Sequence, residues 1–134
     1  MKMKVINTNN APKAIGPYSQ AIQICNGTLY LSGQLGLDAK TMELPECLIE
    51  QTKNVFANID AILKEAGYSK NDVVKTLVLL KDINSFSKVN ELYEEYFEDH
   101  KPARSAFQVA ALPKDAAIEI EVIAYKNSNN NCSM

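Results

Sequence analysis

The stretch "PARSAFQVAALPKDAAIEIEVIA", residues 102–124, decides the fold. It predicts two strands joined at "LPKDA", and apolar and polar residues alternate along the second strand. Successive side chains of a strand point to opposite faces of the sheet. One face of the second strand is apolar and carries Ile118, Ile120, Val122 and Ala124. The other face mixes charge with apolar bulk and carries Glu119, Glu121, Ile123 and Tyr125.

This mixed face has the composition of a surface that another subunit covers. In a chain of 134 residues two helices can cover one face of the sheet, and no further element is left for the other face. We therefore expect an oligomer, with ring symmetry.

The remaining elements precede these two strands in the chain. The hydrophobic periodicity predicts strands over 4–7, 20–24, 28–31 and 73–82, and helices over 45–66 and 85–99. Asn26 and Gly27 predict a hairpin turn, and Gly67 suits the position after a helix end. The continuously apolar run 73–82 predicts a strand buried on both faces. The order βββαβαββ predicts an α+β fold with a mixed sheet and two helices on one face.

Arg104 raises the question of structure or chemistry. If the last two strands are neighbours, Arg104 and one of the two glutamates lie close together. One interpretation is a structural ion pair that ties the sheet or a subunit contact, and the residues alone favour it. The other is a functional pair, in which the guanidinium grips a substrate carboxylate with two hydrogen bonds while a glutamate handles water.

Composition narrows the class of protein. Hydrophobic residues make up 46% and charged residues 22%, as in an ordinary globular chain, so we expect one domain over 1–126 and a disordered tail over 127–134. No apolar run is long enough for a membrane span, and the N-terminus has no signal-peptide core. We expect a cytoplasmic protein, with a short organellar targeting segment left open.

Two further classes of site find little support in the sequence. Cys25, Cys47 and Cys132 are widely spaced, so we expect reduced thiols. His100 is the single histidine, and we expect no metal site. The net charge is −2 and the lysines are scattered, so nucleic acid is not an expected partner.

Four stretches together resemble the RidA (YjgF) family of reactive intermediate deaminases, also called L-PSP endoribonucleases, most closely its eukaryotic members. They are "AIGPYSQAI", "LYLSGQLGLD", "VVKTLVLLKDINSFSKVNELYEEYF" and the opening stretch, and the match runs from about residue 11 to residue 125. The resemblance implies a chorismate-mutase-like α+β fold and homotrimers with ligand clefts between subunits. It also implies hydrolysis of 2-imino acids or their enamine tautomers, such as 2-iminobutanoate and 2-iminopropanoate, to 2-keto acids and ammonia, without a cofactor.

The same resemblance implies roles for five positions. Arg104 of "PARS" corresponds to the residue that binds the substrate carboxylate, and Glu119 of "IEIE" to the residue that holds the attacking water. Tyr18 of "GPYSQ" and Ser32 of "LSGQ" correspond to residues that line the pocket. Gly33 offers a backbone N–H without side-chain obstruction.

Other positions have weaker or structural assignments. Asn90 of "KVNELY" matches a motif residue that we expect to be structural, and Ala106 replaces the cysteine of many bacterial members, so only its backbone N–H is available. Lys101 stands where the family pattern suggests an apolar residue, which bears on substrate preference if it edges the cleft. We expect Glu121 in a structural ion pair and His100 as a solvated residue near a helix end.

Two other functions stay open. An endoribonuclease agrees with one of the family's names, but the chain lacks a histidine pair and is acidic. A non-catalytic trimer that binds small carboxylates would need Arg104 and the cleft but not Glu119.

Overall fold

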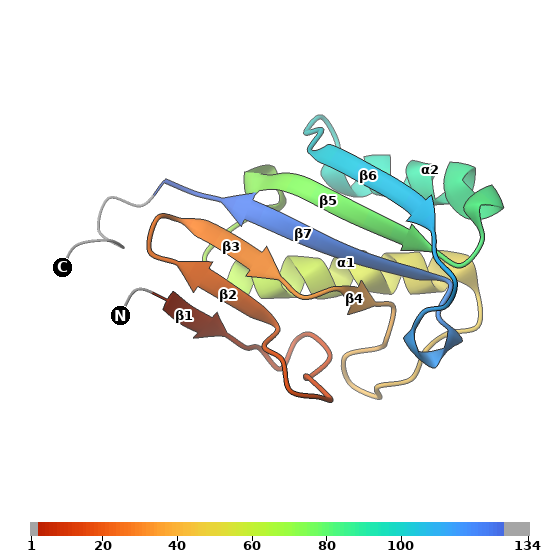
Figure 1. The fold of residues 1–134 in the computed structure, drawn as a ribbon, viewed down its shortest axis with the longest axis horizontal. Coiled ribbons are helices and arrows are strands. Elements are labelled where there is room, and N and C mark those ends of the chain that lie inside the picture. Colours follow the sequence, from red (N-terminus) through yellow and green to blue (C-terminus); the bar gives the residue numbers. More distant parts are fainter. Residues whose placement is uncertain (1–2, 128–134) are drawn as a thin grey trace.

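A computed structural model describes residues 3–127 of the protein. One mixed sheet has the strand order β1-β2-β3-β7-β5-β6, and β4 pairs with β7 (Figure 1). The strands are β1 Met3–Ile6, β2 Ala21–Ile24, β3 Thr28–Leu31, β4 Gln34–Leu35, β5 Val73–Leu80, β6 Ala103–Gln108 and β7 Ile118–Tyr125. The helices α1 Leu48–Glu65 and α2 Phe86–Phe97 both lie on one face of this sheet. The predicted α+β class and the one-sided helices are confirmed.

The element order differs from the prediction by one strand. β4 lies in the glycine-punctuated segment "SGQLGLD", where two residues are too few to show an alternating pattern. The observed order is therefore ββββαβαββ. Of the tail predicted over 127–134, residues 128–134 lie outside the described part of the chain.

The hairpin between β2 and β3 forms at the predicted dipeptide. Gly27 has φ +102°, a conformation that glycine adopts without strain, and the N–H of Thr28 donates to Oδ1 of Asn26 at 2.9 Å. A Cβ atom on Gly27 would lie 2.1 Å from the carbonyl oxygen of Lys126. The turn therefore requires glycine both for its backbone and for the chain that crosses beside it.

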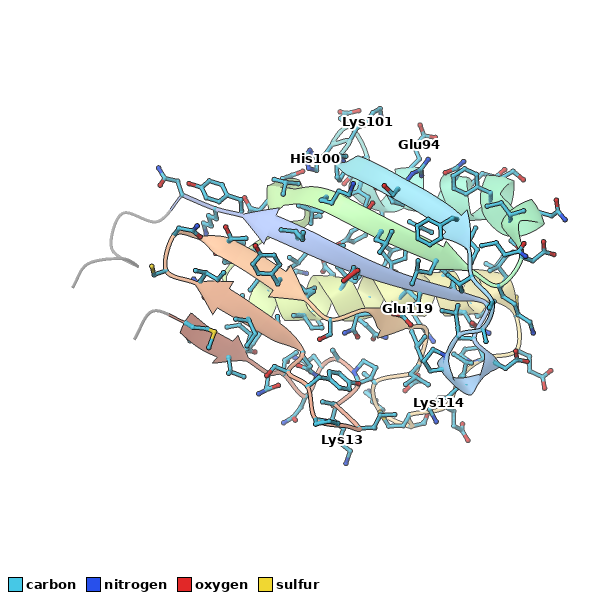
Figure 2. The ribbon with its side chains drawn as sticks, viewed as in Figure 1. Lys13, Glu94, His100, Lys101, Lys114 and Glu119 are labelled. Carbon is cyan, nitrogen blue, oxygen red and sulfur yellow. The ribbon has the colours of Figure 1, made fainter. Side chains whose placement is uncertain are left out.

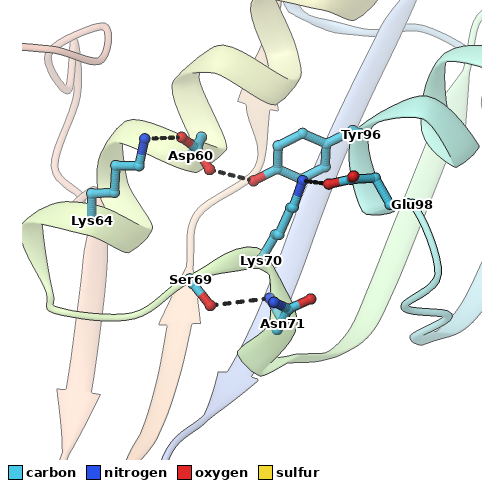
Figure 3. A network of polar contacts seen from close by, with 7 residues as sticks. All are labelled: Asp60, Lys64, Ser69, Lys70, Asn71, Tyr96 and Glu98. Atoms are coloured by element: carbon cyan, nitrogen blue, oxygen red, sulfur yellow. Dashed lines mark hydrogen bonds and ion pairs between the residues drawn. The ribbon is translucent and has the colours of Figure 1, made fainter.

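A polar network fastens the two helices to each other (Figure 3). The hydroxyl of Tyr96 in α2 donates to Oδ1 of Asp60 in α1 at 2.8 Å, and Lys64 pairs with the other carboxylate oxygen at 2.8 Å. Lys70, just beyond α1, forms an ion pair with Glu98 at the end of α2. Burial raises the pKa of Tyr96 above its ordinary range, so this phenol stays a neutral hydrogen-bond donor.

The two helices cover one face of the sheet and leave the other face open. Toward the helices, Val78 of β5 and Ile118 and Ile120 of β7 are fully buried. On the opposite side, which we call the open face, large side chains are half exposed or exposed. They are Tyr30, Leu77, Leu79, Phe107, Ile123 and Tyr125. The prediction that 73–82 is buried on both faces is therefore wrong for the single chain, because no element of residues 3–127 covers the open face.

Neither helix within residues 3–127 is long and apolar enough to cross a membrane.

Candidate active site

Arg104 lies on the edge strand of the sheet and reaches over α2. β6 runs parallel to β5 with Arg104 opposite Thr76, so the arginine belongs to the helix-covered side. Its Nη1 donates to Oδ1 of Asn90 at 2.7 Å. Its guanidinium carbon lies 4.9 Å from the ring centre of Phe86 and 4.8 Å from that of Tyr93.

These contacts hold the guanidinium in place and leave much of it free. The two rings attract the cation, and Asn90 takes one of its five N–H groups. No ion pair of Arg104 with a carboxylate occurs within residues 3–127. The remaining N–H groups therefore suit a planar anion such as a carboxylate, which accepts two parallel hydrogen bonds.

Sequence reasoning missed the two aromatic partners of Arg104. Tyr93 is buried, and its hydroxyl lies 2.8 Å from Oγ1 of Thr76. Burial raises the pKa of Tyr93, so its hydroxyl stays protonated beside the arginine. The available signal was the spacing of Phe86, Asn90 and Tyr93, which places all three on one stripe of a helix.

A cavity of about 460 Å³ opens beside Arg104 and Asn90. Lys101 and Glu94 line it (Figure 2), and Glu98 is a further lining residue. His100 also lines it, and Nε2 of this ring lies 2.6 Å from the carbonyl oxygen of Val73. The expectation of a solvated His100 is wrong, because the half-buried ring joins the end of the α2 segment to β5.

A second cavity, of about 370 Å³, gathers Tyr18, Ser32 and Gly33. Its other lining residues are mainly apolar and include Ile15, Leu35 and Leu37. Oγ of Ser32 donates to the carbonyl oxygen of Ser19 at 2.6 Å. This bond fixes the loop that carries Tyr18, so the hydroxyl proton of Ser32 is engaged in a structural hydrogen bond.

Glu119 lies against the second cavity through Gly33. A Cβ atom added to Gly33 would be 2.1 Å from Oε2 of Glu119, so only glycine leaves room for this carboxylate. Glu119 is half buried on the open face, beside β4 (Figure 2). Burial, and secondly the charge of Glu121, raise the pKa of Glu119 above its usual range. A carboxyl with increased proton affinity suits proton transfer with water.

The two groups of residues are separated within one chain. β5 lies between β6 and β7, so the hypothesis that the last two strands are neighbours is wrong. Arg104 pairs with Thr76 and Glu119 pairs with Leu79, three residues further along β5, which places the two side chains on opposite faces. Strand pattern predicts which residues share a face of one strand, but it does not predict which strand inserts between two others.

The other assigned residues divide as follows. Ala106 is on the same face as Arg104, packs against the hydrophobic core and lines neither cavity. Glu121, expected in an ion pair, has none within residues 3–127. Over the same residues, no cluster of three or more histidine, cysteine, aspartate or glutamate side chains is arranged to hold a metal ion.

Comparisons with known proteins agree with this fold. The model of the family described as Endoribonuclease L-PSP matches residues 8–126. The RutC family protein PH0854 of Pyrococcus horikoshii is 57% identical over 124 residues, which is 92% of this chain and 98% of that protein. A mouse protein named 2-iminobutanoate/2-iminopropanoate deaminase is 53% identical over 122 residues, 90% of each chain.

A solved structure gives the same result. The crystal structure of a putative endoribonuclease L-PSP from Entamoeba histolytica superposes with a TM-score of 0.90 at 50% identity, covering 93% of this chain and all of that one. Both the sequence and the fold therefore show that the chain belongs to the Endoribonuclease L-PSP family, also known as the RidA/YjgF family.

Proposed function

We propose that the protein hydrolyses reactive 2-imino acids, with 2-iminobutanoate and 2-iminopropanoate as substrates, to 2-keto acids and ammonia. The observation that carries this proposal is the guanidinium of Arg104, which Asn90 and two rings hold in place without any carboxylate partner in residues 3–127. The names of relatives at about 50% identity support it, since the mouse, human and bovine proteins are named 2-iminobutanoate/2-iminopropanoate deaminase.

The reaction centre in this proposal is shared between neighbouring protomers of a homotrimer. Arg104 and Glu119 lie on opposite faces of one sheet, and each adjoins its own hollow. The open face carries exposed aromatic side chains, among them Tyr30 and Phe107, and a second copy would bury them. In the cleft so formed, Arg104 of one protomer faces Tyr18, Gly33 and Glu119 of the next.

Three residues divide the chemistry. Arg104 binds the substrate carboxylate with two hydrogen bonds and so fixes C2 of the imine. Glu119 takes a proton from water as the water oxygen bonds to C2, and it gives this proton to the imine nitrogen, which forms a carbinolamine. It then moves the proton of the new hydroxyl group to the amine, so that the C–N bond breaks, the C=O bond forms and ammonia leaves. Proton transfer of this kind supplies about 10²- to 10⁴-fold in rate. Ser32 keeps the loop of Tyr18 in place at the cleft.

The first test follows a competing trap. Threonine dehydratase generates 2-iminobutanoate, semicarbazide traps it, and an active protein lowers the rate of trapping. We expect suppression by the wild type, none by Arg104→Ala, and suppression reduced about 100-fold by Glu119→Ala. Full suppression by an Arg104→Ala protein that elutes as the native oligomer would remove the proposed site.

The second test addresses the shared cleft. Arg104→Ala and Glu119→Ala chains are unfolded together in equal amounts and refolded, and activity is measured against each variant refolded alone. With random assembly about a quarter of the clefts regain both residues, so activity returns to about a quarter of the wild-type level. No recovery in a mixed trimer would contradict a cleft built by two protomers.

An endoribonuclease is the second candidate, because the family description carries that name. The same variants decide it: RNA cleavage that persists through repurification and disappears with Arg104→Ala would favour a nuclease. A protein that binds 2-ketobutyrate tightly without suppressing trapping would instead be a non-catalytic binder of small carboxylates.

We also propose that the protein acts in the cytoplasm. Cys25 and Cys47 are free thiols in the structure, as suits a reducing compartment.

A further inference from the structure

Glu119 and Glu121 form a pair of carboxylates on the open face. They are two residues apart in β7, so their side chains point the same way. Directly across on β5, Glu119 pairs with Leu79 and Glu121 with Leu77, so neither carboxylate has a cation opposite it. Two like charges with apolar neighbours repel each other more strongly than they would in water.

Few other charged groups face this pair from the elements that pack against β7. β3 contributes Tyr30 and β4 contributes Leu35, and β6, on the far side of β5, contributes Ser105 and Phe107, none of them charged. Tyr125 lies further along β7, and Lys81 and Asp115 near the strand ends pair with each other at 3.0 Å. In the proposed trimer the neighbour adds Arg104.

Lys75 is the one lysine that β5 places on this face, and it is nearer to Glu121 than to Glu119. It pairs across with Ile123, next but one to Glu121, and lies four residues from Leu79, the partner of Glu119. Lys75 and Glu121 line the same hollow of about 210 Å³, and Nζ of Lys75 donates to Oγ of Ser105 at 3.3 Å. This cation therefore offsets part of the negative charge that the two carboxylates place on the open face.

We propose that Glu121 is a positioning residue for the hydrolysis, which acts through Glu119 by holding a second negative charge beside that carboxylate on the open face. The inference rests on the proposed function, because it assigns Glu119 as the base. An ordinary glutamate is a weak base at neutral pH, and a base works best when its pKa approaches the working pH. Burial and then Glu121 raise the pKa of Glu119, in agreement with the geometry.

The direction of the effect follows from the charge. The base must be ionised, so activity falls as the pH falls through the pKa of Glu119, and this fall is the acid limb of the profile. Removing the negative charge of Glu121 lowers that pKa and moves the acid limb to lower pH. Removing the positive charge of Lys75 moves it to higher pH.

The test compares pH profiles of kcat/KM for the wild type, Glu121→Gln, Glu121→Asp and Lys75→Met. We expect opposite displacements for Glu121→Gln and Lys75→Met, and a wild-type limb for Glu121→Asp, which keeps the charge. Glu65→Gln, which removes an exposed charge at the end of α1, is the matched control and should give the wild-type profile within about twofold at each pH. Gel filtration verifies the oligomer for each variant.

A second readout does not depend on activity. Carbon-13 NMR follows the titration of the Glu119 carboxyl, assigned by the signal that Glu119→Gln removes, and its midpoint should fall in Glu121→Gln. An unchanged Glu119 titration in folded Glu121→Gln, or an acid limb that stays in place, would overturn the inference. A wild type without hydrolytic activity would instead overturn the proposed function, whatever the NMR titration shows.

Discussion

The two faces of the sheet differ in how many of their side chains find a partner within the same chain. On the helix-covered face the chain supplies every partner: Ile120 and Val78 are fully buried, and Thr76 is hydrogen-bonded to Tyr93. On the open face Leu77 and Leu79 stay half exposed, and Glu121 has no ion pair within residues 3–127. One face therefore stabilises the fold of the single chain, and the other face is the one that a second copy covers in the proposed assembly.

The two main residues of the proposed reaction centre are also positioned in different ways. Arg104 takes its position from Asn90 and two rings of its own chain, so its geometry exists before any assembly. The Glu119 carboxylate has room only because Gly33 lacks a side chain, and burial, then the charge of Glu121, raise its pKa. In the proposed site, attractive contacts position the anion-binding group, whereas the carboxylate depends on the space at Gly33, on burial and on the charge of Glu121.

The largest expected effect is a difference in folding stability between substitutions on the two faces. Ile120→Ala opens a cavity under the helix-covered face and should lower the free energy of unfolding by about 2–4 kcal/mol. Phe107→Ala, on the open face with 48% of the residue exposed, should cost less than about 1 kcal/mol in a dilute, dissociated sample and instead weaken assembly. Urea unfolding and sedimentation measure the two effects. Equal losses of folding stability would erase the distinction.

The next effect concerns the space at Gly33. Gly33→Ala should displace the Glu119 carboxylate and lower kcat/KM about 100-fold, since misplacing a catalytic group by about 1 Å has a cost of that order. Glu65→Ala is the control, because this exposed residue at the end of α1 lines neither cavity. Steady-state rates from the semicarbazide assay measure both. A Gly33→Ala enzyme with wild-type kinetics would show that the carboxylate has no fixed position.

A smaller effect is expected at the anchor of Arg104. Asn90→Ala removes the 2.7 Å hydrogen bond but leaves both rings, so KM should rise about tenfold, about 1.4 kcal/mol, with kcat largely kept. Asn71→Ala, at an exposed position outside both helices, provides the control. A fall in kcat with unchanged KM would assign Asn90 to the chemical step instead of to binding.

The smallest effect is a gain in stability. The pKa of Glu119 is raised in the folded protein, so folding favours its protonated form, and the ionised form costs stability as the pH rises through that pKa. Glu119→Gln should therefore raise Tm slightly at pH 7.5, and the gain should vanish near pH 4, below the unfolded pKa of about 4.3. Thermal unfolding at the two pH values measures it. A lower Tm at pH 7.5 would mean that the ionised carboxylate stabilises the fold.

The sequence predicts the elements well where local chemistry decides them. The hairpin at Asn26 and Gly27, the two helices and the apolar face of β7 all follow from turn residues and periodicity. The two residues of β4 and the insertion of β5 between β6 and β7 depend on contacts between distant segments. No pattern within one strand contains that information.

The candidate site shows the same division. Family motifs placed Tyr18, Ser32 and Gly33 together, and the structure brings them to one cavity. The rings beside Arg104 were missed because aromatic residues on a helical stripe usually belong to the core. Tyr93 belongs to the core and also contacts the arginine, and spacing alone cannot separate the two roles.

The placement of Arg104 and Glu119 on opposite sides of one sheet has a consequence for newly synthesised chains. If the cleft is shared as proposed, a freshly folded chain has sound architecture but no reactivity until it meets its neighbours. At low protein concentration, the total hydrolytic activity should then rise more steeply than the amount of protein. Dilution alone should abolish the activity without unfolding the chain.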